Sequence, residues 1–308
     1  MSEKKRIYLK PEHEDVLKNR PVAPWIDEVP EGDFVTPYPT YESGKYFDLF
    51  EKKYFEKDGF RMKYYFFDPT KNGYDGKKKH PILIFLHGTS NSLVDDLCIN
   101  YTGAELYASK SYQDTLGGAY ILIPVANEYK DENGKTKGFW DKDYLVPTHA
   151  LIMNFINEHS ENIGKRILFG NSSGGRFSLM LMDNYMDDFD AVIPVGSCEL
   201  GNDEVLDKYE EKGKVLFLAM GKRDEFNHYD QMIAPTLDKL NSMKHSFIYT
   251  PDWVRNGDKG IASIDGGIEM GQHCLMNAVQ CNLMFDDNTP MDERLPGGLT
   301  GWIAENIL

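Results

Sequence analysis

Ser172 stands in a setting that could make its hydroxyl a nucleophile. Residues 170–175 read Gly-Asn-Ser-Ser-Gly-Gly, which contains the pattern G-x-S-x-G, and they lie between an apolar run at 166–169 and a helical stretch. Glycine two positions before and after a serine lets a strand and a helix approach closely and holds the serine in a strained turn. The start of the following helix would favour a developing oxyanion. Ser172 has glycine at both of these positions, whereas Ser173 has Asn171 two positions before it, so the spacing favours Ser172. The alternative is an ordinary turn before a helix.

An acidic residue and a histidine follow Ser172 in the order that suits a serine nucleophile. Asp224 comes soon after one apolar run, and His273 follows the last apolar run and a long loop. A histidine in that place can take the serine proton, while a carboxylate orients the imidazole and stabilises its charged form. Asp224 is favoured over Glu225 by its spacing from the strand and its shorter side chain. The alternative is that the charged residues around Asp224 form a solvated cluster.

The loop after the first strong apolar run, residues 81–86, is the candidate for an oxyanion hole. This run continues into His87-Gly88-Thr89. The backbone N–H groups of Ser173 and Thr89 are predicted to bind the oxyanion, and Gly88 lets the chain approach the substrate carbonyl. His87 could act as a base in principle, but it precedes the serine. We expect it to brace the loop through hydrogen bonds.

These residues need a scaffold on which several loops converge, and the apolar pattern predicts one. Six short apolar runs are bounded by turn residues, and they cover residues 81–86, 119–125, 166–169, 191–195, 215–220 and 246–250. Segments of helical length include 144–158, 174–185, 229–243 and 275–285. Continuous apolar runs separated by helices are typical of parallel strands buried on both faces. With a pair of antiparallel strands before them, at about 45–68, they predict an α/β fold with a mostly parallel, doubly wound sheet.

Residues 1–45 differ from the rest of the chain. They are polar, contain several prolines and carry no regular period, so they favour extended or turn structure. We expect an N-terminal extension that is packed on the surface of a single catalytic domain formed by residues 46–308. A contribution of the extension to the substrate cleft is left open.

The charge balance disfavours some classes of partner. The chain has 49 acidic and 34 basic residues, which gives a formal net charge of −15. Such a surface repels the phosphates of nucleic acids and anionic membrane faces. The sequence has no run of about 18 apolar residues, and no apolar leader follows its charged first residues. We expect a cytoplasmic protein, either a monomer or a homodimer.

The four cysteines do not predict a zinc site. None forms a CxxC pair, and the sequence has no HExxH motif, so neither a metal nor a cofactor is expected. Cys198 and Cys274 fall in loops that should approach the site. A disulfide between these two is the alternative to free thiols.

Four of these segments together resemble a known group of enzymes. They are residues 86–88, 170–175, 221–224 and 271–273. The set resembles the α/β-hydrolase superfamily, and within it the chain is similar to the polyhydroxybutyrate depolymerase-like and feruloyl esterase-like carboxylesterases. The resemblance covers roughly residues 55–308. It implies an α/β-hydrolase fold and a serine esterase without a cofactor, whose triad would be Ser172, Asp224 and His273.

The loops that follow the strands are expected to shape the substrate pocket. The segment between the fourth and fifth parallel strands is too short to hold a large cap domain. Candidate pocket residues are His87, Trp140, Glu199 and Trp253. Aromatic residues in uncapped loops favour a small or aryl-containing ester, such as a hydroxycinnamate. The alternatives are a serine peptidase or amidase on the same fold, and a catalytically silent homologue that binds a ligand.

Overall fold

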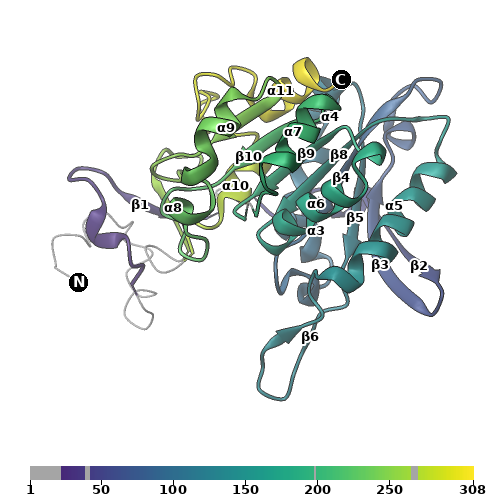
Figure 1. The fold of residues 1–308 in the computed structure, drawn as a ribbon, viewed down its shortest axis with the longest axis horizontal. Coiled ribbons are helices and arrows are strands. Elements are labelled where there is room, and N and C mark those ends of the chain that lie inside the picture. Colours follow the sequence, from purple (N-terminus) through teal and green to yellow (C-terminus); the bar gives the residue numbers. More distant parts are fainter. Residues whose placement is uncertain (1–21, 39–41, 198, 265–269) are drawn as a thin grey trace.

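The computed structural model describes residues 22–38, 42–197, 199–264 and 270–308. A central sheet lies between two layers of helices (Figure 1). The sheet has eight strands in the order β11-β10-β9-β8-β4-β5-β3-β2. Their bounds are β2 (Glu51–Lys57), β3 (Phe60–Phe67), β4 (His80–Leu86), β5 (Tyr120–Val125), β8 (Ile163–Asn171), β9 (Ala191–Val195), β10 (Val215–Ala219) and β11 (Ser246–Tyr249).

The pairing of the strands confirms the predicted sheet. The neighbours from β5 through β4, β8, β9 and β10 to β11 are all parallel, and these six strands are the six predicted apolar runs. β3 runs antiparallel to β5, and β2 runs antiparallel to β3, as expected for the segment ahead of them. Two small sheets stand apart from the central one. They are formed by β1 (Val35–Pro37) with β12 (Ile261–Ser263), and by β6 (Tyr129–Lys130) with β7 (Thr136–Lys137).

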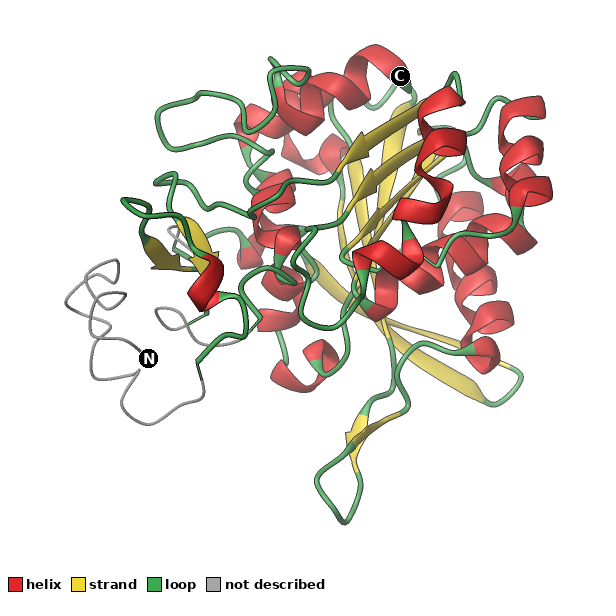
Figure 2. Ribbon diagram, turned by 60° about the vertical axis from the view of Figure 1, so that its left-hand side comes forward, coloured by secondary structure: helices red, strands yellow, loops and turns green. Residues whose placement is uncertain are grey.

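The helices cover both faces of the sheet (Figure 2). Their bounds are α3 (Leu97–Tyr101), α4 (Lys110–Leu116), α5 (Leu145–Glu158), α6 (Ser173–Asn184), α7 (Asp203–Glu211), α8 (Tyr229–Met232), α9 (Leu237–Ser242), α10 (Leu275–Gln280) and α11 (Gly298–Asn306). Between β9 and β10 the described residues form one helix, α7, which is too short to be a cap domain. Across the described ranges, no helix combines the length and the apolar character that crossing a membrane requires.

The apolar runs are continuous because each parallel strand is buried on both faces. In β4, Ile82 and Ile84 point into one core cluster, while Leu83 and Phe85 point into the other. Side chains of α5, α6, α7 and α9 fill the first cluster, and side chains of α3, α4, α10 and α11 fill the second. Successive residues of a strand face opposite sides, so every position must be apolar when both sides carry helices.

At the end of β8 the chain turns directly into α6, and two glycines make this turn possible. A Cβ on Gly174 would lie 2.1 Å from the carbonyl oxygen of Leu86, in β4. A Cβ on Gly170 would lie 2.1 Å from the carbonyl oxygen of Gly174. Both obstacles are backbone atoms, which cannot rotate away as a flexible side chain could. The missing side chains therefore fix the place where α6 begins relative to β4 and β8.

Two of the predicted helices are shorter in the structure. The segment 229–243 is divided into α8, a 3-10 turn and α9. Pro235 lies in that turn, and its missing N–H prevents a continuous helix. The helix predicted at 275–285 ends with α10, because Asn282 has a φ of 63°, which an α-helix does not accommodate.

The described part of the N-terminal extension packs on the loop that follows β11. Residues 22–38 contribute β1, which lies parallel to β12 in that loop. Trp25, Ile26 and Val29 form a small buried cluster with Val35 of β1 and with Ile261 of β12. The division of the chain into an extension and a catalytic domain at residue 45 stays a prediction.

Replacing Gly174 by alanine tests the close packing at the turn. Because the new Cβ would meet the backbone of β4, we expect Gly174→Ala to lower the free energy of unfolding by about 1–3 kcal/mol. Thermal or urea unfolding measures this. Gly301→Ala in α11 is the control, since a Cβ on Gly301 would meet no atom within 4 Å. It should leave stability unchanged or raise it by up to about 1 kcal/mol. Equal stabilities of the two variants would contradict the packing argument.

Candidate active site

Ser172 occupies the strained position between β8 and α6. Its backbone has φ 53° and ψ −117°, a region that residues with a side chain rarely adopt. The Ser172 N–H donates to the carbonyl oxygen of Val195 in β9 at 2.8 Å, and the Ser172 carbonyl accepts from the N–H of Gly175 at 2.8 Å. Hydrogen bonds on both sides therefore hold the residue in this conformation. The side chain stays partly exposed, so its hydroxyl is open to a reactant.

The three residues of the predicted triad are joined by hydrogen bonds. The Ser172 hydroxyl donates to Nε2 of His273 at 2.9 Å, and Nδ1–H of His273 donates to Oδ2 of Asp224 at 2.8 Å. The Asp224 carboxylate is fully buried, and its Oδ1 accepts the N–H groups of Phe226 at 2.9 Å and Asn227 at 2.8 Å. These donors fix the carboxylate, and the carboxylate sets the imidazole tautomer that leaves Nε2 free to accept the serine proton.

A second carboxylate holds the main chain of the histidine loop. Glu225 accepts the N–H of His273 at 2.7 Å through Oε2, and the N–H of Gln272 at 3.1 Å through Oε1. The two neighbouring acids therefore have different partners: Asp224 binds the imidazole of His273, and Glu225 binds the backbone that carries it. From sequence, Glu225 is only the less favoured candidate for the triad acid, because no local pattern signals a carboxylate that binds distant amides.

Gly196 is another residue that the sequence does not single out. It follows β9 with a φ of 68°, and a Cβ on it would lie 3.1 Å from the carbonyl oxygen of His273 and 3.7 Å from ring atoms of that residue. A side chain at this position would therefore press on the loop that carries His273. Glycine lets the end of β9 pass directly beneath the imidazole.

Cys274 follows the histidine but is not a rival nucleophile. Burial raises the pKa of its thiol to about 12, and the charges of Glu225 and Asp224 add to the effect. The reactive thiolate is therefore scarce at neutral pH. Cys274 carries a free thiol, as do Cys98 and Cys281. Cys198, its alternative partner in a disulfide, lies outside the described residues.

The oxyanion donors predicted from sequence lie on both sides of the serine. Ser173 is the first residue of α6, so its N–H has no acceptor within the helix and is available to an oxyanion. On the other side, Gly88 packs against the residue before the nucleophile: a Cβ on Gly88 would lie 3.4 Å from Nδ2 and 3.5 Å from the carbonyl oxygen of Asn171. Thr89 follows and is exposed. The loop after β4 is thereby brought next to Ser172.

His87 and Trp140 hold this loop through hydrogen bonds in the protein interior. Nδ1–H of His87 donates to the carbonyl oxygen of Gly88 at 2.7 Å, and Nε2 accepts the N–H of Ala126 at 3.0 Å. Burial lowers the pKa of His87, in keeping with this neutral tautomer. Trp140 donates its indole N–H to the carbonyl oxygen of His87 at 2.9 Å and stacks on Phe177 at 4.9 Å. Both side chains are fully buried, which corrects their assignment to the substrate pocket.

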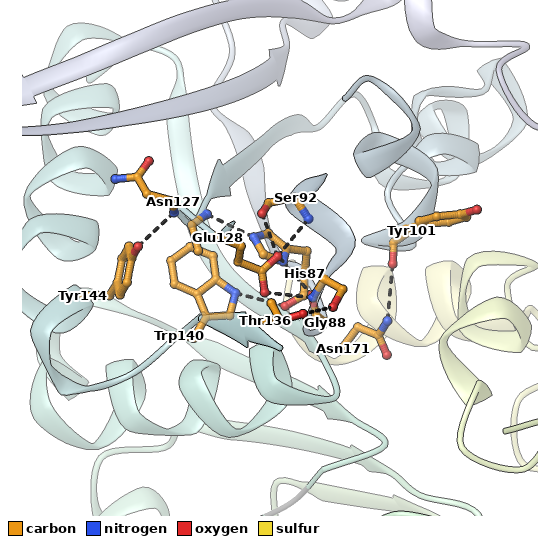
Figure 3. Close-up of polar contacts among 12 residues, drawn as sticks. His87, Gly88, Ser92, Tyr101, Asn127, Glu128, Thr136, Trp140, Tyr144 and Asn171 are labelled. Carbon is orange, nitrogen blue, oxygen red and sulfur yellow. Dashed lines mark hydrogen bonds and ion pairs between the residues drawn. The ribbon is translucent and has the colours of Figure 1, made fainter. Parts of the chain in front are cut away.

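The loop is also held by a buried carboxylate, which Figure 3 shows at the centre of the network. Glu128 accepts the N–H of Ser90 at 2.8 Å through Oε1, and the N–H and hydroxyl of Ser92 at 3.1 and 2.6 Å through Oε2. Its side chain has no exposed surface, and one oxygen lies 3.9 Å from Nδ1 of His87. Charge-assisted bonds to backbone N–H groups are strong where water is excluded. Glu128 therefore fixes the direction of the loop after β4, residues 87–92, which we call the oxyanion loop after its predicted role.

Glu128 lies at the base of a hairpin arm, residues 127–138, that projects from the body of the molecule (Figures 1 and 2). The arm contains β6 and β7. At its base, the Ser90 and Thr136 hydroxyls lie 2.6 Å apart, and the Asn127 N–H donates to the hydroxyl of Tyr144 at 2.9 Å. The arm and the oxyanion loop are therefore attached to each other, although they come from different strands.

The other two pocket candidates differ in their surroundings. Glu199 is exposed, next to the end of β9. Trp253 lines a cavity of about 300 Å³. The other residues around that cavity are Tyr249, Pro251, Asp252, Arg255, Phe285 and Met291. Because no triad residue borders this cavity, its presence does not assign Trp253 to the substrate site.

An exposed aromatic side chain that the sequence does not single out lies next to the triad. Phe226 is 56% exposed, and its ring contacts the ring of His273 edge to face at 5.0 Å between centroids. Large apolar groups that remain open to water next to a nucleophile suit an apolar or aromatic reactant.

The described residues of the site form no cluster that could hold a metal. In the ranges that the structure describes, no three His, Cys, Asp or Glu side chains are grouped so that they could hold an ion. The chemistry that the described side chains can perform is nucleophilic attack by Ser172, with proton transfer through His273.

Comparison with solved structures identifies the fold. A thermostable esterase aligns with a TM-score of 0.54 at 18% identity, over 68% of this chain and 56% of the esterase. A structure described as FAE aligns with a TM-score of 0.53 at 13% identity, over 80% of this chain and 92% of that one. A mutant of the feruloyl esterase module from Clostridium thermocellum, complexed with sinapinate, aligns with a TM-score of 0.53 at 14% identity, over 83% and 96%.

These similarities, together with the strand order and the strained serine turn, show that the chain has the α/β-hydrolase fold. The chain spans little more than half the length of the thermostable esterase. Neither a protein-family model nor a curated protein matches the sequence.

Exchanging Glu128 for glutamine tests the support of the oxyanion loop. The amide nitrogen of glutamine would face the N–H groups of Ser90 or Ser92, so the loop should shift. We expect a fluorophosphonate probe to label Ser172 about 10- to 100-fold more slowly in Glu128→Gln. Glu132→Gln, an exposed residue of the same arm, is the matched control and should react like the wild type. Unchanged labelling of a folded Glu128→Gln would contradict the role of the carboxylate.

Proposed function

We propose that the protein is a serine carboxylesterase that hydrolyses small or aryl-containing esters through an acyl-enzyme. The observation that carries this proposal is the continuous hydrogen-bond chain from the buried Asp224 carboxylate through His273 to the partly exposed Ser172 hydroxyl. Such a chain activates a serine that would otherwise be a weak nucleophile.

In the first step, the Ser172 oxygen attacks the ester carbonyl carbon while Nε2 of His273 takes the hydroxyl proton. The imidazole becomes a cation between Ser172 and Asp224, where the fixed carboxylate stabilises it without accepting the proton itself. The hydrogen bonds from Phe226 and Asn227 keep the carboxylate in place during this change. No rearrangement of the base is needed, because its hydrogen bonds already have the reactive directions.

The tetrahedral intermediate carries a negative charge on the former carbonyl oxygen. The N–H of Ser173 at the start of α6 and the N–H of Thr89 in the loop after β4 are the proposed donors to this oxygen. Oriented donors at a helix N-terminus are worth more in a site that excludes water. The support of the loop by His87 and Glu128 keeps the second donor aligned.

The intermediate collapses when His273 returns the proton to the departing alkoxide, so the alcohol leaves and Ser172 stays acylated. Water then attacks the acyl carbon, and His273 takes a proton from it in the same way. Collapse of the second intermediate breaks the bond to Ser172 and returns the proton to the serine oxygen. The products are one alcohol and one carboxylic acid.

The exposed aromatic ring next to the triad supports an aryl-containing acyl group. Phe226 lies against the catalytic imidazole and remains 56% exposed, so it can contact the part of the acyl chain nearest the reaction. Among the similar structures, the module from Clostridium thermocellum is a feruloyl esterase and was complexed with sinapinate, an aromatic acid. A hydroxycinnamate ester is therefore the substrate class that we propose.

We also propose that the enzyme works in the cytoplasm. The free thiols of Cys98, Cys274 and Cys281 support a reducing compartment, since oxidising compartments favour disulfides.

Hydrolysis of p-nitrophenyl acetate and butyrate tests the proposed activity. The wild type should release p-nitrophenol at neutral to mildly alkaline pH, and Ser172→Ala should lower kcat by about 10⁴-fold or more because the nucleophile is lost. Ser173→Ala keeps the backbone donor and should retain most of the activity. A folded wild type that hydrolyses neither ester would overturn the proposal. Labelling by a fluorophosphonate would then separate a peptidase from a silent homologue.

Replacing Phe226 by alanine tests the acyl preference. Loss of one aromatic contact should raise KM for methyl ferulate about 3- to 10-fold and leave KM for p-nitrophenyl acetate nearly unchanged. Tyr54→Ala, which removes an exposed aromatic ring from β2, should change neither value. If Phe226→Ala affects both substrates equally, the ring acts on the catalytic histidine and not on the acyl group.

A further inference from the structure

We propose that the N-terminal segment, residues 22–38, is a working part of the active site, because it fixes the loop that carries the catalytic base. This inference rests on the proposed function and deepens it, since it names Trp25 and Glu225 as positioning residues for His273. The segment lies outside the central sheet, at the α8 end of the molecule, opposite β2 and β3 (Figure 1).

The segment reaches the base through one buried aromatic residue. Trp25 is 3% exposed, and its indole N–H donates to the carboxylate of Glu225. The same carboxylate accepts the backbone N–H groups of Gln272 and His273. Glu225 therefore joins the N-terminal segment to the main chain of the catalytic histidine. The Trp25 ring also contacts Trp253 edge to face, at 5.8 Å between centroids.

The segment also supports the base through the strand pair β1–β12. The N–H of Ile261 donates to the carbonyl oxygen of Phe34 at 2.9 Å, and the N–H of Tyr38 donates to the carbonyl oxygen of Ser263 at 2.8 Å. Among the described strands, β1 is the only one that pairs with β12. Without the segment, this side of β12 would expose its backbone groups to water and lose its fixed position.

β12 in turn carries the residues next to the base. The side chain of Gln272 is fully buried; it donates to the carbonyl oxygen of Ala262 at 3.0 Å and accepts the N–H of Val254 at 2.8 Å. A Cβ on Gly271 would lie 2.1 Å from the carbonyl oxygen of Ala262, so the two stretches of chain are in direct contact. A shift of β12 would therefore move residues 271–273 as a unit.

Polar contacts along the segment keep it docked in one register. Asp33 forms a two-pronged ion pair with Arg255, with distances of 3.0 and 2.7 Å. Near its start, Glu28 accepts from Arg223 at 2.8 Å. Two-pronged arginine–carboxylate pairs fix direction as well as distance. The segment is thus tied to both loops that supply the base and its acid.

The expected effect on catalysis follows from the sensitivity of proton transfer to distance. The base and the nucleophile are 2.9 Å apart, and misplacement by about 1 Å can cost on the order of 100-fold in rate. Substrate contacts are not made by Trp25 in this scheme, so its loss should change kcat and leave KM close to the wild-type value.

The test is a double-mutant cycle on ester hydrolysis. Trp25→Phe keeps an aromatic ring but removes the N–H, and should lower kcat about 3- to 10-fold; Glu225→Gln should lower it about 10- to 100-fold. Because Trp25 acts through Glu225, the double variant should be no slower than Glu225→Gln alone. Glu305→Gln, which removes an exposed carboxylate from α11, is the control and should match the wild type.

A second readout does not depend on turnover. The proton on Nδ1 of His273 gives a low-field NMR signal because it is bonded to Asp224, and this signal should shift or broaden in Trp25→Phe and Glu225→Gln. If the wild type hydrolyses no ester, the proposed function fails while the NMR comparison still tests the inference. If Trp25→Phe does not fold, Asp33→Asn weakens the same docking from the surface and should lower kcat about threefold.

The inference is overturned by any of three results. A folded Trp25→Phe with wild-type kcat and an unchanged NMR signal would show that the segment only packs on the surface. Independent, multiplying effects of Trp25→Phe and Glu225→Gln would show that the two residues act separately. A change in KM alone would place Trp25 on the substrate path.

Discussion

The hydrogen bond between Ser172 and His273 joins two residues that are 101 positions apart in the chain, across a distance of 2.9 Å. Each lies on a separate loop beyond the carboxyl edge of the sheet. The conformation of neither loop is fixed by a helix or strand of its own. The parallel strands bring both loops to the same edge of the sheet, so the two residues lie near each other. The remaining precision has to come from contacts that the loops make with other parts of the molecule.

Carboxylates supply much of that precision, and they do it in the same way at three places. Asp224 accepts two backbone N–H groups of its own loop, Glu225 accepts two of the histidine loop, and Glu128 accepts two of the oxyanion loop. An irregular loop exposes N–H groups that no sheet or helix satisfies, and a carboxylate can bind several of them at once. Removing such a carboxylate leaves buried amides without acceptors, so each one defines a loop conformation.

The sequence predicted the parts of this structure that local patterns determine. The apolar runs locate the strands because burial on both faces requires an apolar residue at every position. The glycines around Ser172 locate the strained turn because close backbone contact excludes a Cβ at Gly170 and Gly174. Chain order and the position after a strand were enough to favour Asp224 and His273, which the structure brings together.

What the sequence could not predict depends on contacts between distant segments. Glu128, Glu225 and Trp25 look like ordinary polar or aromatic residues until the fold shows which amides they meet. The assignment of Trp140 to the substrate pocket failed for a related reason, since an aromatic residue in a loop after a strand can turn inward as well as outward. The indole N–H of Trp140 donates to the His87 carbonyl, and its ring stacks on Phe177. Burial of this side chain therefore leaves no polar group without a partner.

Two elements outside the central sheet, the hairpin arm and the N-terminal segment, contact different loops around Ser172. The arm is attached to the oxyanion loop after β4, and the N-terminal segment is attached to the loop that carries His273. Neither contributes to the strained turn at Ser172, which backbone contacts with β4, β8, β9 and α6 hold in place. In the reaction that we propose, changes in the arm would therefore alter oxyanion binding, and changes in the segment would alter proton transfer, while Ser172 keeps its position.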